Sequence, residues 1–86
     1  MKNLKDDMKA NQLLREIGIT AKYSHVRNKY ILDIEKMIEL QYLVTCWIDS
    51  NVNYSSKQIR EDLVKIITYS LLDEIILYLN VAEYKQ

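Results

Sequence analysis

The chain has only one glycine and no proline among its 86 residues. Tight β-turns depend on residues that tolerate positive φ, and glycine is the usual one. Long helices need neither glycine nor proline. Hydrophobic residues make up 49% of the chain, which is enough to form a buried core. We therefore expect an all-α fold, a compact bundle of three to five helices in which residues 1–86 form a single domain.

The spacing of apolar residues predicts a first helix from about Leu4 to Ile17. Asp6 and Asp7 lie near its start, where the helix dipole favours negative charge. Gly18 follows directly after the helix, in the position where a left-handed residue commonly ends one. We expect Gly18 to be that terminating residue.

A second helical segment is predicted after residues 18–20, with Thr20 or Ser24 as its N-cap. No helix breaker occurs before residue 49, so the segment is either one helix of about 28 residues or two helices with a bend near residues 39–41. Five apolar residues fall on one face of this segment, Val26, Tyr30, Ile34, Ile38 and Val44, and they are joined by Ile31, Met37 and Trp47.

Residues 49–56 are rich in Asp, Ser and Asn and predict a turn, with Ser55 or Ser56 capping a last helix. A long apolar stripe follows, formed by Ile59, Leu63, Ile66, Ile67, Leu71, Ile75 and Leu79. Residues 71–79 are too apolar to face solvent broadly, so they form either the central helix of the domain or half of a dimer interface. The candidate interface residues are Leu71, Leu72, Ile75, Ile76, Tyr78 and Leu79.

Catalytic chemistry finds little support in this sequence. His25 and Cys46 are the only histidine and the only cysteine, and the predicted helix keeps them apart, so a nucleophile and base pair is not expected. A single glycine rules out a glycine-rich phosphate loop. We expect a protein that is not an enzyme and that uses no cofactor and no metal. Cys46 and Trp47 are expected in the core.

Hydropathy and charge limit where the chain works and what it binds. No apolar run approaches the roughly 18 residues of a membrane span, and the first residues lack a signal-peptide core. We expect a cytoplasmic protein without a membrane partner. Residues 1–36 have eight Lys and Arg against five Asp and Glu, whereas residues 37–86 have four against seven. The two halves therefore differ in sign, +3 and −3, although the net charge is zero.

Two basic clusters are candidates for contacts with DNA. One opens the last helix, where a recognition helix meets base edges in the major groove, and contains Lys57, Gln58, Arg60 and Lys65. The other lies near the start of the second segment and would hold phosphates through Lys22, Arg27 and Lys29. Together they predict a small DNA-binding transcriptional regulator with a helix-turn-helix at about residues 43–67.

Two stretches of the chain, 13–34 and 43–67, resemble the C-terminal DNA-binding domain of the sporulation master response regulator of endospore-forming bacteria. The first carries Leu13-Leu14-Arg15-Glu16-Ile17-Gly18-Ile19-Thr20, similar to the family pattern L-L-x-E-L-G-I-P. The second follows the apolar and hydroxyl spacing of the family's helix-turn-helix at Ile48, Val52, Ser55, Ile59 and Leu63. The resemblance implies a helical domain that docks its last helix in the major groove, as a monomer or as a dimer.

A different class of function is nearly as well supported. Zero net charge, acidic residues in the last helix and seven tyrosines favour a protein-binding module. Such a module would be an inhibitor or adaptor of the type that phages or mobile elements direct at a host protein. Either function is compatible with a homodimer, which we expect.

Overall fold

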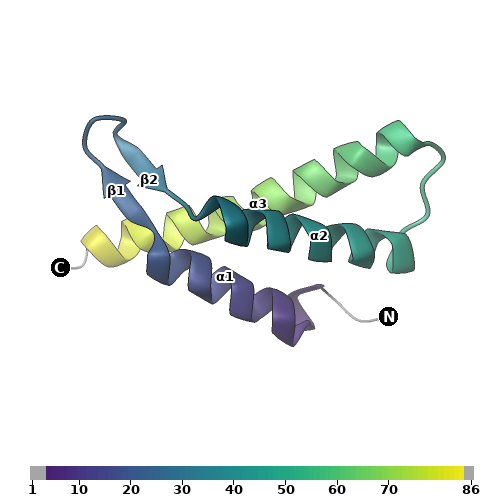
Figure 1. Ribbon diagram of the computed structural model, residues 1–86, viewed down its shortest axis with the longest axis horizontal. Coiled ribbons are helices and arrows are strands. Elements are labelled where there is room, and N and C mark those ends of the chain that lie inside the picture. The colour runs from purple at the N-terminus through teal and green to yellow at the C-terminus, as the bar shows by residue number, and fades with distance from the viewer. Residues whose placement is uncertain (1–3, 85–86) are drawn as a thin grey trace.

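The computed structural model of the protein describes residues 4–84 (Figure 1). A short 3-10 helix, η1 (Leu4–Asp6), leads into α1 (Met8–Thr20). Two antiparallel strands follow, β1 (Lys22–Ser24) and β2 (Lys29–Ile31), and the chain then forms α2 (Ile34–Asn51) and α3 (Lys57–Tyr84). Most of the described chain is helical, as expected, but it also contains a β-hairpin that the sequence analysis did not predict.

Helix α1 begins at a side-chain cap and continues past its only glycine. Asp7 Oδ1 accepts hydrogen bonds from the backbone N–H groups of Lys9, at 2.9 Å, and Ala10, at 3.2 Å. Gly18 lies inside the helix with no positive φ, so the prediction that it ends the helix is wrong. The helix ends at Thr20 because Ala21 takes an extended conformation that leads into β1.

The hairpin occupies residues that were expected to begin the second helix. Tyr23 pairs with Tyr30 across the two strands. Asn28 supplies the positive φ that the turn needs, 53°, a conformation that Asn tolerates better than most residues. The Tyr23 hydroxyl donates a hydrogen bond to Asn28 Oδ1, and Ser24 Oγ accepts one from the backbone N–H of Arg27. An asparagine turn therefore replaces the glycine turn whose absence argued against strands.

Helix α2 begins after the hairpin, so neither Thr20 nor Ser24 is its N-cap. That position belongs to Asp33, whose Oδ1 accepts a hydrogen bond from the backbone N–H of Glu35 at 3.0 Å. The helix then runs for 18 residues without interruption at residues 39–41. Both interpretations of this segment, one helix of about 28 residues and two helices with a bend, are wrong.

Helix α3 confirms the sequence-based prediction at its start. Ser56 Oγ accepts a hydrogen bond from the backbone N–H of Ile59 at 3.2 Å, which makes Ser56 the cap that was expected at residue 55 or 56. The helix continues for 28 residues. None of the described helices combines the length and the apolar character that a bilayer crossing requires.

The three helices pack against one another around a single apolar core. Its most buried side chains are Ile17 from α1 and Leu40, Val44 and Ile48 from α2. Helix α3 contributes Val64, Leu71 and Leu72 to the same core. Leu71 and Leu72, which were expected at a dimer interface, are therefore buried within the chain itself.

Helices α2 and α3 run side by side in opposite directions, and α1 packs against both (Figure 1). Residues 43–67 form the closed end of this helical hairpin. In a helix-turn-helix the two helices cross at about 90–120° across a turn of three or four residues. The antiparallel arrangement does not confirm the predicted helix-turn-helix.

Candidate interaction surfaces

Arg60, predicted to contact DNA, instead binds a carboxylate of its own chain. Its Nε lies 2.7 Å from Asp49 Oδ1 and its Nη2 lies 2.7 Å from Asp49 Oδ2. The hydroxyl of Tyr54 donates a further hydrogen bond to Asp49 Oδ1 at 2.9 Å. These bonds join the end of α2, the connecting loop and the first turn of α3.

The charges of this pair neutralise each other. The Arg60 guanidinium, with the Tyr54 hydroxyl, lowers the pKa of Asp49 to about 2. Asp49 in turn raises the pKa of Arg60. Gln58, another predicted DNA contact, donates a hydrogen bond from Nε2 to Asp62 at 3.0 Å. Two of the four predicted contacts at this helix start are thus engaged within the chain.

Lys57 and Lys65 remain exposed and form no ion pair with any residue of the described chain. The other predicted cations, Lys22, Arg27 and Lys29, all belong to the β-hairpin or its turn. In Figure 1 the hairpin and the α2–α3 loop lie at opposite ends of a molecule that measures 45 × 25 × 20 Å. The structure therefore brings the three hairpin cations together but separates them from those of α3.

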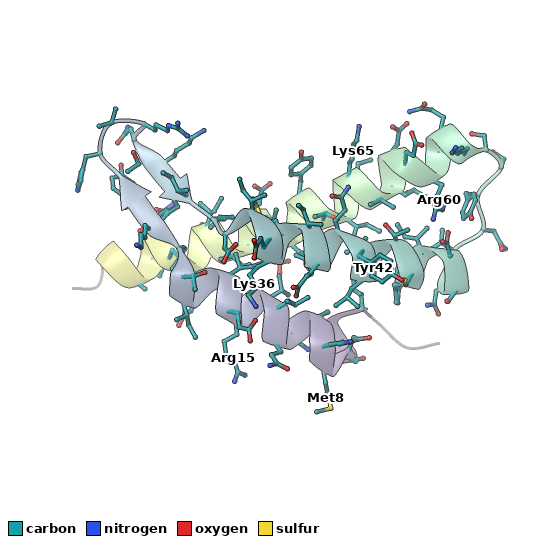
Figure 2. All side chains as sticks on the ribbon, viewed as in Figure 1. Met8, Arg15, Lys36, Tyr42, Arg60 and Lys65 are labelled. Carbon is teal, nitrogen blue, oxygen red and sulfur yellow. The ribbon has the colours of Figure 1, made fainter. Side chains whose placement is uncertain are left out.

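The outer face of α2 carries two residues of the apolar face predicted for this segment, whereas Val44 of the same predicted face is buried. Ile34 is 68% exposed and Ile38 is 60% exposed. Tyr42, one turn further along, is exposed as well (Figure 2). The core side of α2 is instead formed by residues 40, 44 and 48. The exposed stripe and the core stripe overlap on this helix. Because both have helical spacing, the sequence does not indicate which of the two packs against α1 and α3.

Ile34 and Ile38 of the exposed stripe border a groove of about 230 Å³ between α2 and α3. Tyr69, which is 63% exposed, stands at its α3 side. The groove is mostly apolar, and Lys65 is the single charged residue among those that line it. We call this surface the α2–α3 groove; it is lined by Ile34, Met37, Ile38, Gln41, Lys65, Thr68, Tyr69 and Leu72.

Thr68 is an unusual residue in this groove. It is only 6% exposed, and its Oγ1 has no hydrogen-bond partner among the described residues. The hydroxyls of Thr20 and Thr45 instead donate to the carbonyl oxygen four residues earlier, each at 2.9 Å. A buried hydroxyl without a partner is destabilising, so Thr68 is a weak point of the core next to the groove.

The α1–α2 boundary differs from the groove because its charges are paired. Lys36 of α2, labelled in Figure 2, has its Nζ 2.9 Å from Glu16 Oε2 of α1, so the pair joins the two helices. The hydrogen bond and charge of Lys36 lower the pKa of Glu16, and Glu16 raises that of Lys36. Both groups are therefore charged at neutral pH and need no external counter-ion.

Cys46, expected in the core, is exposed, whereas Trp47 is half-buried. Ile75, Ile76 and Leu79 of the expected dimer interface are partly buried, and Tyr78 is exposed. Within residues 4–84 no group of three or more His, Cys, Asp or Glu side chains is arranged to hold a metal ion.

The α2–α3 groove and the basic hairpin are candidates for binding, beside a second apolar hollow of about 340 Å³ that Trp47, Ile66 and Leu71 help to line. The spacing of Ile34, Ile38 and Tyr42 is visible in the sequence, but only the packing shows that these residues face outward. Comparisons with protein-family models, with curated proteins and with solved structures find no match to this chain, so its function is inferred from the geometry of these surfaces.

Proposed function

We propose that the chain is a small protein-binding module and that its contact surface is the α2–α3 groove. The observation that supports this proposal is the exposure of Ile34, Ile38 and Tyr69 around one apolar hollow. Clustered apolar and aromatic side chains around a pocket are typical of the energetic centre of protein interfaces. A module of this kind acts by binding to its partner protein, as an adaptor or an inhibitor.

The size of the groove favours a protein side chain over a small molecule. At about 230 Å³ it is below the range of roughly 300–1,000 Å³ that is typical of small-molecule sites. Its floor and walls suit one or two apolar side chains. We therefore propose that an amphipathic helix of the partner inserts an apolar residue between Ile38 and Tyr69.

Lys65 adds a requirement for charge. It borders both the α2–α3 groove and a more polar hollow that Gln41, Thr45, Arg60, Glu61 and Val64 help to line. Since no described carboxylate pairs with Lys65, an Asp or Glu next to the apolar anchor would complement it. A second copy of the chain fits less well, because a symmetric dimer centred here would bring two Lys65 side chains together.

Direct readout of DNA by the start of α3 is less well supported by the geometry. Arg60 is held by Asp49, and Gln58 by Asp62. Glu61 and Asp62 are exposed beside them and would repel phosphates. The predicted helix-turn-helix function would have to rely on Lys57 and Lys65 alone at this end of the molecule.

The proposal can be tested with displayed helical peptides of about 15 residues, selected for binding to the protein. We expect the selected peptides to share an apolar anchor with an Asp or Glu nearby. Ile38→Glu should weaken their binding by about tenfold or more, because it places a charge in the apolar hollow. Lys65→Glu should weaken it as well, and a peptide with Lys in place of its acid should restore it.

Ile66→Glu is the matched control, since Ile66 is 64% exposed but lies outside the α2–α3 groove. Circular dichroism should show that all variants keep the wild-type helix content. If the selected peptides bind Ile38→Glu as tightly as the wild type, the groove is not the contact surface. Sedimentation that shows a dimer broken by Ile38→Glu would assign the groove to a second copy instead.

A further inference from the structure

We propose that the β1–β2 hairpin, residues 22–31, is a contact site for the phosphates of duplex nucleic acid, separate from the α2–α3 groove. The hairpin contains Lys22, Arg27 and Lys29, and all three are exposed. Between Glu16 and Asp33 the chain has no carboxylate side chain. None of the three cations forms an ion pair with a described residue. The hairpin is therefore a local concentration of positive charge on a protein whose net charge is zero.

The pairing of the strands places two of these cations on one face. Ser24 pairs with Lys29 and Lys22 pairs with Ile31, so alternate residues on each strand bring Lys22 and Lys29 to the same side of the hairpin. Arg27 lies in the turn, where its backbone N–H is held by Ser24 Oγ at 3.2 Å. Neighbouring like charges repel one another, and an anion between them removes that repulsion.

Aromatic contacts on the opposite face stabilise the conformation of the hairpin. The rings of Tyr23 and Tyr30 meet edge to face with centroids 5.1 Å apart, and the ring of His25 lies 5.0 Å from that of Tyr23. The bond between Tyr23 and Asn28 closes the turn. The backbone that carries the three cations is therefore held in one conformation by these contacts. This reduces the conformational entropy that the hairpin loses on binding.

Duplex nucleic acid suits this ribbon better than a single strand does. A two-stranded β-ribbon fits the major groove of a duplex. Binding of single strands depends on aromatic rings on which bases stack. Tyr23 and Tyr30 are half-buried and engaged with each other, so the hairpin offers bases no open ring from this pair. Val26, 98% exposed in the turn, is free to contact the wall of a groove.

The test is a fluorescence anisotropy titration of a short labelled duplex of arbitrary sequence, starting at about 50 mM salt. We expect weak binding whose affinity falls with salt with a log–log slope of about −2.7, as three neutralised phosphates predict. The triple variant Lys22→Gln, Arg27→Gln, Lys29→Gln should lose this binding. Arg27→Gln alone should reduce the slope by about one third.

Lys57→Gln with Lys65→Gln is the matched control, because it removes two exposed cations of α3 that lie outside the hairpin. This variant should bind the duplex as the wild type does, and so should Ile38→Glu, which separates this site from the α2–α3 groove. Equal loss of binding in the α3 control would assign the contact to α3 and overturn the proposal. So would a triple variant that still binds the duplex but no longer binds phosphatidylserine vesicles, since the hairpin would then be a membrane contact.

Discussion

Arg60 in the first turn of α3 forms a two-pronged salt bridge with Asp49 near the end of α2, with both N–O distances at 2.7 Å. The two residues are separated by 11 positions, and the loop between them contributes the Tyr54 hydroxyl to the same carboxylate. The planar guanidinium matches the two carboxylate oxygens. The pair therefore ties the first turn of α3 to the end of α2, in addition to the packing of the two helices in the core.

Asp49→Asn should lower the thermal stability of the protein at neutral pH, and the difference should disappear in acid. The pKa of Asp49 is about 2 in the folded chain against an ordinary value of 3.8. A lowered pKa means that the carboxylate stabilises the folded state above about pH 4 and loses this effect as the pH falls through about 2. Melting curves of both proteins between pH 7 and pH 2 measure this convergence.

Asp73→Asn serves as the control for that comparison, because Asp73 is an exposed acid of α3 with no ion pair among the described residues. It should change the melting temperature little at either pH. A gap between the wild type and Asp49→Asn that stays constant down to pH 2 would show that the charge of Asp49 is not what stabilises the loop.

Gly18→Ala should stabilise the protein by about 0.5–1 kcal/mol, because alanine restricts the unfolded chain and favours a helix interior. A Cβ at this position would lie 3.8 Å from Ile75 Cγ2, an ordinary contact distance. Chemical denaturation of the two proteins gives the difference in the free energy of unfolding. Loss of stability would show that the added methyl group is not accommodated next to Ile75.

Thr68→Val should raise the free energy of unfolding by about 1 kcal/mol, because it replaces a buried hydroxyl that has no described hydrogen-bond partner with a methyl group of similar shape. Thr68→Ser keeps the hydroxyl and removes the methyl group, so it should lower stability. Urea titration of both variants measures the two effects. If Thr68→Val is destabilising, the hydroxyl has a partner that stabilises the folded state.

Local features of the sequence determined the helical character and part of the helix ends. Asp7 and Ser56 cap helices because an oxygen on a short side chain reaches backbone N–H groups two or three residues away. Such contacts depend only on neighbours in the chain. The start of α3 was therefore predictable, as was the predominance of helix in a chain with one glycine.

Tertiary structure decided the features on which function depends. The apolar residues of α2 form two overlapping stripes, and contact with α1 and α3 buries Leu40, Val44 and Ile48 while leaving Ile34 and Ile38 exposed. The partner of Arg60 is also set by the folded chain rather than by its neighbours. Hydrophobic burial has no direction of its own, so helical spacing identifies candidate faces, and only the packing of three helices selects the face that remains open for a partner.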